Sequence, residues 1–301
     1  MKKILITGAS GFVGTCLVNQ LLANGDFVVG MGTSIRHPFI QDNQRFEWVS
    51  ADTSREGDWQ KKIAAADVII NLAGQNIFRF WTKAYKKAIY DSRILTTRHI
   101  VNAIEKNANQ LLLTTSAVGI YGDCGDQLLI EKNNHGTGFL SNVCVDWERE
   151  GLKARDKGTR VLVMRFGVIL GAQGALAKMG PAFKMFVGGP LGNGSQWFPW
   201  IHIKDIEKGV QFLMDHEDLE GIFNFCAPEP VRQKDFAKSL GRVLNRPSFL
   251  PVPAFLVKSI MGELGKAFLE SQRAIPGHLT DAGYTFLFSR VDSALDDILG
   301  K

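Results

Sequence analysis

The chain has 301 residues, 45% of them hydrophobic and 22% charged, which is ordinary for a globular enzyme and sufficient for one large α/β domain with a smaller lobe. It contains no apolar run of about 18 residues and no dense basic block interleaved with aromatic residues. We therefore expect neither a membrane nor a nucleic acid as a partner, and we interpret the net charge of +5 as a mixed, solvated surface.

The cysteines are scattered along the chain and form neither a C-x-x-C pair nor a metal-ligand spacing. We therefore expect reduced thiols, no metal site and a cytoplasmic location. The first predicted strand starts within three residues of Met1, so we also expect no signal peptide. The four cysteines are Cys16, Cys124, Cys144 and Cys226.

A glycine-rich turn near the N-terminus is the most informative stretch of the sequence. It follows a short apolar run at 3–6, typical of a buried parallel strand, and precedes a helix with one apolar stripe. Gly8 would permit the tight turn, Gly11 would let a pyrophosphate approach the backbone, and Gly14 would let the helix pack close to the strand. Since the start of a helix attracts phosphate, this arrangement predicts dinucleotide binding rather than a plain strand-to-helix turn.

Strands and helices alternate along the next part of the chain. Further strands are predicted at 26–32, 46–50, 67–74, 111–116 and 160–166, with helices at 59–65 and 82–106. This alternation predicts a doubly wound parallel sheet with right-handed connections.

Glycines and prolines interrupt this rhythm between Gly167 and Pro199. A helix at 205–214 and a strand at 222–225 then return to it, and helices are expected near 255–269 and 291–299. We expect the later pieces to form a smaller, discontinuous C-terminal lobe that covers the carboxyl ends of the strands, where open α/β sheets bind ligands.

Three motifs resemble the extended short-chain dehydrogenase/reductase superfamily, which includes nucleotide-sugar epimerases and dehydratases. They are the glycine turn at 7–14, the strand end Asn-Leu-Ala-Gly at 71–74, and Ser-Ala-Val-Gly-Ile-Tyr-Gly at 116–122. Further stretches resemble its atypical, NAD(P)-dependent epimerase/dehydratase-like subfamily, namely 80–82, 92–93, 143–148, 188–192, 200–205 and 251–253. The resemblance extends from Lys2 to about Leu299 and implies a Rossmann fold with a C-terminal substrate lobe.

The expected domains follow from this reading. Residues 1–170, with 201–226 returning to them, would form the NADP-binding Rossmann domain. Residues 171–200 and 227–301 would form the substrate-binding lobe.

The end of the second strand indicates which cofactor is bound. An NAD site usually has Asp or Glu here, bound to the ribose 2′-hydroxyl. This chain has Thr33, Ser34 and Arg36 instead, and such groups can bind a 2′-phosphate, so NADP is favoured over NAD. The alternative is that Arg36 points into solvent.

The resemblance extends the set of cofactor contacts. It implies that Asp52 contacts the adenine amino group; the alternative is an Asp that caps a turn. The candidate cofactor-binding residues are Gly8, Ser10, Gly11, Phe12, Val13, Gly14, Thr33, Ser34, Arg36, Asp52, Leu72, Ala73, Gly74 and Arg93.

The catalytic positions depart from the family pattern. The superfamily uses Ser or Thr after the fifth strand, followed by Tyr and Lys four residues apart on the next helix. Here Ser116 keeps the hydroxyl, but 138–153 offers Cys144 and Glu148 at that spacing, on one helix face. Either the thiol or the carboxyl serves as acid/base beside the nicotinamide, or Cys144 only packs and Glu148 is solvated or ion-paired. Asp123 is a further acid/base candidate.

Several aromatic and polar residues are candidates for the substrate pocket, because indole faces stack on sugar or base rings. The candidates are Gln75, Arg79, Trp81, Gln196, Trp197, Trp200 and His202. The alternative for His202 is a structural helix cap near Asp205. The glycine-rich loop 188–194 is either a lid or a plain connection.

Two functions follow. The first is an NADP-binding oxidoreductase or epimerase-like enzyme acting on a small polar substrate, with a nucleotide-linked sugar as one candidate. The second is a non-catalytic NADPH-binding protein that reports redox state to a partner. The absent Tyr and Lys favour the second, whereas the Cys144 and Glu148 pair and the aromatic pocket favour the first. The sequence predicts no oligomeric state.

Overall fold

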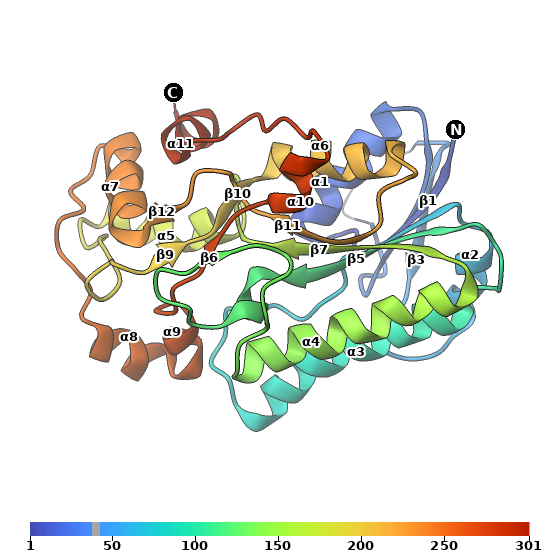
Figure 1. The fold of residues 1–301 in the computed structure, drawn as a ribbon, viewed down its shortest axis with the longest axis horizontal. Helices are drawn as coiled ribbons and strands as arrows, with labels where there is room; N and C mark the ends of the chain where they lie inside the picture. The colour runs from blue at the N-terminus through green and yellow to red at the C-terminus, as the bar shows by residue number, and fades with distance from the viewer. Residues whose placement is uncertain (38–42, 301) are drawn as a thin grey trace.

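The centre of the computed structural model, which describes residues 1–37 and 43–300, is a seven-stranded sheet. Neighbouring strands are parallel, in the order β11-β7-β5-β4-β1-β2-β3 (Figure 1). The strands are β1 (Lys3–Thr7), β2 (Phe27–Gly32), β3 (Phe46–Ser50), β4 (Val68–Asn71), β5 (Leu111–Ala117), β7 (Arg160–Phe166) and β11 (Gly221–Phe225). The predicted parallel α/β sheet is confirmed.

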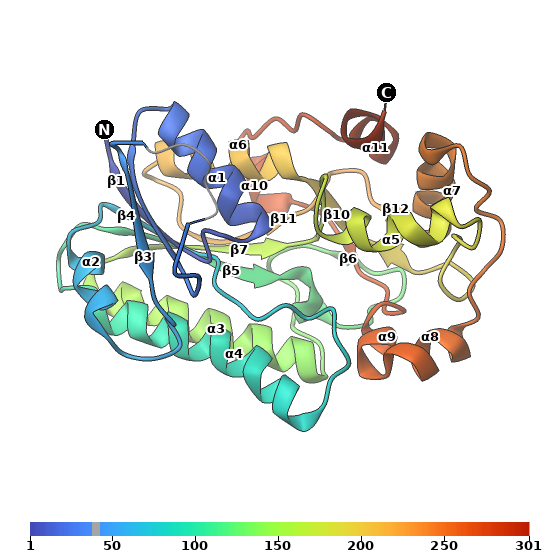
Figure 2. The same ribbon diagram turned by 180° about the vertical axis from the view of Figure 1, so that it is seen from behind.

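Helices cover both faces of this sheet, as Figures 1 and 2 show. On one face lie α1 (Phe12–Ala23) and α6 (Ile203–Asp215), and on the other α3 (Lys83–Ala103), α4 (Phe139–Leu152) and the short α2 (Lys61–Ala64). Alternate residues of β1 divide between the two layers, because Ile4 and Ile6 pack with α1 and α6 whereas Leu5 packs toward α2 and α3. The sheet is thus buried on both sides, which explains why its strands read as continuous apolar runs.

The strand order reverses between β1 and β4. From β1 the chain runs outward to β2 and β3, and then crosses to β4 on the other side of β1. The loops that follow these two neighbouring strands therefore run apart, and this switch point at the carboxyl ends, which we call the crevice, is where such sheets bind ligands. Thr7 and Asn71 pair at this edge, and the Thr7 hydroxyl donates to Asn71 Oδ1 at 2.7 Å.

The later part of the chain adds short strand pairs and helices, most of them at one end of the sheet (Figure 1). The strand pairs are β8 (Val168–Leu170) with β10 (Trp200–His202), β9 (Trp197–Phe198) with β12 (Val231–Arg232), and β6 (Leu128–Leu129) with β13 (Arg273–Ala274). The helices are α5 (Ala175–Lys184), α7 (Gln233–Leu244), α8 (Ala254–Met261), α9 (Glu263–Ala267), α10 (Gly277–Asp281) and α11 (Val291–Leu299). Their core includes Phe183, Trp200, Phe236 and Leu295.

Two sequence expectations need correction here. The region expected to be helical near 255–269 is two helices, because Gly262 adopts φ +60° and ends α8. The interrupted stretch between Gly167 and Pro199 contains α5, which the sequence analysis did not predict. None of the helices in the described part of the chain is long and apolar enough to cross a membrane.

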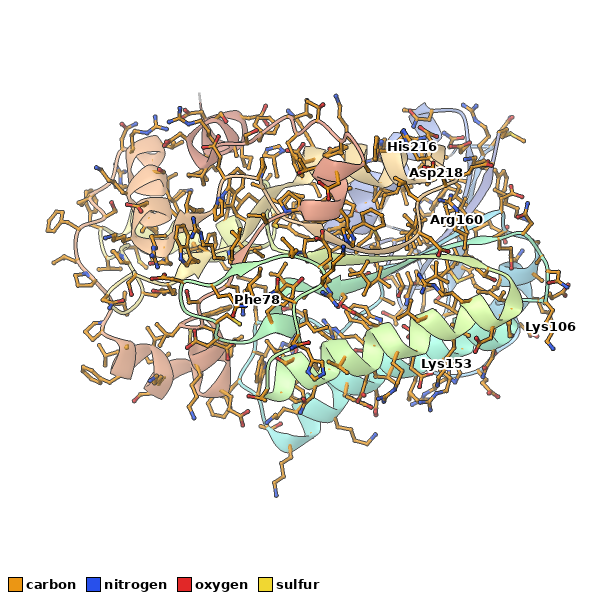
Figure 3. The ribbon with its side chains drawn as sticks, viewed as in Figure 1. Phe78, Lys106, Lys153, Arg160, His216 and Asp218 are labelled. Atoms are coloured by element: carbon orange, nitrogen blue, oxygen red, sulfur yellow. The ribbon has the colours of Figure 1, made fainter. Side chains whose placement is uncertain are left out.

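The amino end of β7 is tied to the turn that follows α6. Arg160 Nη1 donates to the carbonyl oxygens of His216 at 3.0 Å and Leu219 at 2.9 Å, and Figure 3 shows Arg160 and His216 at this end of the molecule. This anchor lies at the amino end of β7, opposite the carboxyl ends at which the crevice lies.

Candidate functional site

The glycine turn after β1 has the geometry that its three glycines were predicted to allow. Gly8 adopts φ +68°, and a Cβ there would lie 2.9 Å from the carbonyl oxygen of Leu72. A Cβ at Gly14 would lie 2.3 Å from the carbonyl oxygen of Gly8, so only glycine lets α1 pack this closely. The helix stops at Ala23 as expected, followed by Gly25 at φ +92°.

The start of α1 is open to an anion. Gly11 precedes the helix, no side chain caps it, and its first turn carries no acidic residue. The unpaired N–H groups and the helix dipole therefore favour a phosphate group here. The side chains of Phe12 and Val13 pack against the protein, with the Phe12 ring against the 171–174 segment. What these two residues can offer a ligand is therefore the backbone N–H.

Arg93 on α3 faces the end of β4. Its Nη1 donates to the carbonyl oxygens of Gln75 and Ile89, both at 3.1 Å, and its guanidinium lies 5.2 Å from the Trp147 ring centre. A Cβ at Gly74 would lie 3.1 Å from the guanidinium carbon, so Gly74 leaves space beside the charge. Within residues 1–37 and 43–300 no carboxylate forms an ion pair with Arg93. A half-buried cation without a counter-charge suits an anionic ligand.

Ser10 lies beside the end of β2. Its Oγ is 3.0 Å from the position that a Cβ on Gly32 would take, and Thr33, Ser34 and Arg36 follow with exposed side chains. Arg36 forms no ion pair with any residue that the structure describes. Three hydroxyls and one guanidinium thus lie at this strand end, which carries no acid.

Asp52 makes local contacts at the end of β3. Its Oδ1 accepts from the backbone N–H of Ser54 at 3.1 Å and from the Ser54 hydroxyl at 2.6 Å, and its Oδ2 is 3.5 Å from Arg55 Nε. These are the contacts of an Asp that caps a turn. The adenine contact stays a prediction.

Ser116 and Cys144 meet at the carboxyl end of β5. The Ser116 hydroxyl is buried, and in the described residues it makes no hydrogen bond of good geometry. The Cys144 thiol lies close enough for a weak bond from Ser116 and from the backbone of Ala117 to lower its pKa. Burial outweighs these bonds and, with the charge of Glu148, raises the pKa of Cys144 to about 11. The group at this position is therefore a protonated thiol at neutral pH.

Glu148 points to a different partner. Both of its carboxylate oxygens accept from Arg165 on β7, from Nε at 2.7 Å and from Nη2 at 2.8 Å, and both residues are 5% exposed. Burial alone would lower the pKa of Arg165, but the hydrogen bonds and the charge of Glu148 raise it. Of the two sequence alternatives for Glu148, these contacts match the ion-paired one; an acid/base role is not tested by them.

Arg165 was not predicted from the sequence, although a single cation within the apolar run 161–166 was a usable signal. Its Nη1 also donates to the Tyr121 hydroxyl at 2.9 Å and to the carbonyl oxygen of Glu131 at 3.2 Å. The Tyr121 hydroxyl in turn donates to Asn224 Oδ1 at 2.9 Å. This buried network joins α4, β7 and β11, at the β11 end of the sheet.

Three predicted substrate residues lie in packed surroundings. Trp81 is 7% exposed and donates from Nε1 to the carbonyl oxygen of Ile77 at 2.9 Å, while Trp200 is 1% exposed. His202 Nδ1 accepts from the backbone N–H of Lys204 at 3.1 Å, and burial lowers the pKa of His202 to about 4. His202 thus caps α6, as its structural alternative proposed. These side chains offer a ligand almost no surface, and we do not carry them into the proposed site.

Gln75 and Arg79 follow β4. The Gln75 side chain lies half-buried, with Nε2 3.2 Å from the Tyr85 hydroxyl, and Arg79 is exposed. Gln75 thus lies next to Arg93, and its backbone carbonyl oxygen accepts a hydrogen bond from the Arg93 guanidinium.

A cleft of about 820 Å³ opens between the loop after β5 and the C-terminal helices. It is lined by Asp123, Gly125, Asp126, Gly192, Asn193, Ser195, Gln196, Arg232, Lys234, Ala254, Lys258, Leu269 and Ser271. Trp197 lies beside it. The guanidinium carbon of Arg232 is 4.0 Å from the centre of the Trp197 ring, and that of Arg273 is 4.6 Å from it. Of the predicted substrate residues, Gln196 therefore lines the cleft and Trp197 flanks it.

Glu270, which the sequence analysis did not single out, lies between two residues that line this cleft. Burial and, to a lesser degree, the charge of Asp123 raise the pKa of Glu270 to about 7. The described residues contain no group of three or more His, Cys, Asp or Glu side chains suited to a metal, and all four cysteines are free.

Comparisons with known proteins cover the whole chain. A model of the NAD dependent epimerase/dehydratase family matches residues 4–226, and a domain of unknown function matches residues 252–298. An epimerase family protein of Staphylococcus haemolyticus is 37% identical over 303 residues, covering 99% of each chain. The chloroplastic homologue of epimerase family protein SDR39U1 from Arabidopsis thaliana is 36% identical over 301 residues, covering 98% of this chain and 86% of that one.

Two solved structures are similar along nearly all of this chain. The human epimerase family protein SDR39U1, solved with NADPH, has a TM-score of 0.85 and 28% identity, and 99% of each chain is covered. A nucleoside-diphosphate sugar epimerase from Corynebacterium glutamicum has a TM-score of 0.78 and 29% identity, covering 99% of this chain and 58% of that one.

Proposed function

This chain belongs to the NAD dependent epimerase/dehydratase family, and we propose that within it the protein is an NADP-binding enzyme that transfers hydride to or from a small polar substrate. The observation that carries the proposal is the crevice between β1 and β4. There the open start of α1 and the uncompensated charge of Arg93 lie on two sides of glycine-lined space. The comparisons do not favour the alternative of a non-catalytic NADPH-binding protein.

The residues of this crevice fit a dinucleotide. Gly8, Gly11 and Gly74 each leave open a volume that a side chain would fill or crowd, and the first-turn N–H groups of α1 would bind the diphosphate. Arg93 would add a charge-assisted contact. Bound NADPH would supply the hydride, while the protein positions the substrate and handles the proton.

The end of β2 supports NADP over NAD. Ser10, Thr33, Ser34 and Arg36 would surround a 2′-phosphate, and no acidic side chain is present there to repel it. The human relative with 28% identity was solved with NADPH, which agrees with this preference.

Replacing Arg36 with alanine should weaken NADPH binding by about 1.5–3 kcal/mol and leave NADH binding unchanged, because one charge-assisted contact to the 2′-phosphate is lost. Calorimetric titration of both cofactors measures this. Arg45→Ala, an exposed arginine at the amino end of β3, is the matched control and should change neither affinity. A preference for NADPH that survives Arg36→Ala would refute the assignment.

Replacing Gly11 with valine should abolish NADPH binding while the protein stays folded, because the side chain would occupy the approach of the diphosphate to the backbone. Gly11 has φ −76°, which valine tolerates. Gly180→Val in α5, where a Cβ would meet nothing within 4 Å, controls for valine at a glycine site. Fluorescence titration with NADPH and circular dichroism provide the two readouts. A folded Gly11→Val protein with normal affinity would show that the phosphates bind elsewhere.

We propose that Cys144 donates the proton of the reaction and that Ser116 hydrogen-bonds the substrate oxygen. With its pKa near 11, the thiol is a proton donor rather than a nucleophile at neutral pH. The Ser116 hydroxyl, which lacks a well-formed bond among the described residues, is free to hydrogen-bond a substrate oxygen. In this reading Glu148 positions α4 through Arg165 instead of moving a proton.

The cleft beside Trp197 is the proposed substrate site, and residues 171–200 and 227–301 are the proposed substrate lobe. Lys234 and Lys258 line the cleft and would favour an anionic substrate, for which a nucleotide-linked sugar is one candidate. Native mass spectrometry of the protein purified without added ligand tests this. Co-purification of NADP(H) with an anionic small molecule is the expected result.

A further inference from the structure

Large apolar side chains gather at one end of the molecule. They are Met185, Phe186, Val187, Phe249, Leu250, Phe255, Leu256 and Ile260, and we call them the α8 surface. Phe249 is 76% exposed, Phe255 67% and Ile260 72%. Both ribbon views place the end of α5 beside α7, with α8 further along at the same end of the molecule, away from the central sheet (Figures 1 and 2).

The segments that carry these side chains are in contact with one another. The Arg246 guanidinium lies 4.8 Å from the Phe186 ring centre, and the backbone of Gly189 meets that of Leu250. Leu191 forms a β-bridge with Val252, immediately before α8. The segments that carry the eight side chains are thus adjacent, and a group of exposed apolar residues of this kind usually marks an interaction site.

Cations predominate in the segments that carry this surface. Residues 157–204 and 236–262 contain no Asp or Glu, and Glu263, which directly follows α8, is paired with Lys86 at 2.6 Å. Lys184 immediately precedes Met185, and Arg246 and Lys258 lie in the second stretch; none of the three forms an ion pair with a described residue. A twofold contact with a second copy would bring these like charges together, whereas an anionic surface would neutralise them.

We propose that the α8 surface docks the protein peripherally on the anionic face of a phospholipid membrane. Phe255, Leu256 and Ile260 would enter the boundary between head groups and acyl chains with α8 lying in the membrane plane, and Lys184 would contact lipid phosphates. This departs from the expectation of no membrane partner, which was derived from the absence of a spanning segment. Docking of this kind needs no spanning helix.

Co-sedimentation of the full chain with vesicles tests the proposal. The probes are vesicles of phosphatidylcholine and phosphatidylglycerol in a two-to-one ratio, and vesicles of phosphatidylcholine alone. We expect binding to the anionic vesicles, weakened by salt, and little binding to the neutral ones. Absence of the protein from the anionic vesicle pellet at low salt would overturn the proposal.

Variants separate the apolar and the charged contributions. Phe255→Ser combined with Ile260→Ser should reduce partitioning at least about tenfold, and Lys184→Gln should reduce it about fivefold. Leu287→Ser is the matched control, because Leu287 is also an exposed apolar residue but follows α10. It should bind like the parent protein. Since the replaced side chains are exposed, unchanged thermal unfolding is expected for every variant.

Sedimentation velocity tests whether a second copy of this chain, and not a membrane, binds the α8 surface. If the parent protein is a dimer that Phe255→Ser and Ile260→Ser convert to a monomer, and it does not bind vesicles, the α8 surface is a contact between copies and the proposal fails. Equal vesicle binding by the double variant and the parent would also refute it.

Discussion

Replacing Glu148 with alanine is expected to lower the free energy of unfolding by about 3–5 kcal/mol, because it leaves the Arg165 guanidinium buried without a counter-charge. The side chains of both residues are 6% exposed, so water cannot replace the lost carboxylate without opening the packing of α4 on β7. Chemical denaturation followed by circular dichroism measures the change.

Glu150→Ala is the matched control for this variant. Its carboxylate is equally buried, but its partners Arg98 and Lys153 are 46% and 52% exposed and can be solvated when it is lost. We expect a cost of about 1 kcal/mol. Adding Arg165→Met to Glu148→Ala should recover part of the stability, since the unpaired buried charge is removed. Equal losses for Glu148→Ala and Glu150→Ala would refute the structural role of Glu148.

The sheet and its crevice were predictable because their signals are local. An apolar run followed by glycines at Gly8, Gly11 and Gly14 specifies strand, turn and helix within about 20 residues. The signal that favours NADP, which is the absence of a carboxylate directly after β2, is equally local. The 291–299 helix likewise ends where its apolar periodicity ends.

What the sequence did not reveal depends on contacts between distant segments. Trp200 and His202 suggested a pocket by residue type, yet the pairing of β10 with β8 places them in the core. The added strands outside the central sheet have only two or three residues, which is too short for an alternation of apolar and polar residues to be recognised. By contrast, α7 carried a readable pattern in Gln233, Phe236, Ala237 and Leu240, and it was overlooked.

Arg165 and Glu148 illustrate the same limit at the site. The spacing of Cys144 and Glu148 correctly placed both on one side of α4, where both are buried. Whether that face meets a ligand or another side chain depends on β7, whose Arg165 pairs in register with Ser116 of β5. No spacing within α4 contains this information.

Cys144→Ala is expected to reduce NADPH-dependent turnover about 10²–10⁴-fold, the usual cost of losing an acid/base group. NADPH affinity should not change, because a proton donor contributes to the transition state more than to the ground state. NADPH oxidation with simple keto compounds as probes measures the first quantity, and calorimetry the second. In the parent protein the rate should hold through neutral pH and fall only as the pH approaches about 11, where the thiol loses its proton.

Cys226→Ala supplies the control, because Cys226 is a fully buried thiol in the same apolar cluster. It reproduces the loss of a buried sulfur without touching Ser116. If Cys144 only packs, the two alanine variants will lose similar stability and keep similar turnover. A structure with bound NADPH in which the Cys144 sulfur points away from the nicotinamide would end the catalytic assignment. With Glu148 engaged by Arg165, the thiol beside Ser116 is the group on this face of α4 still available to donate a proton.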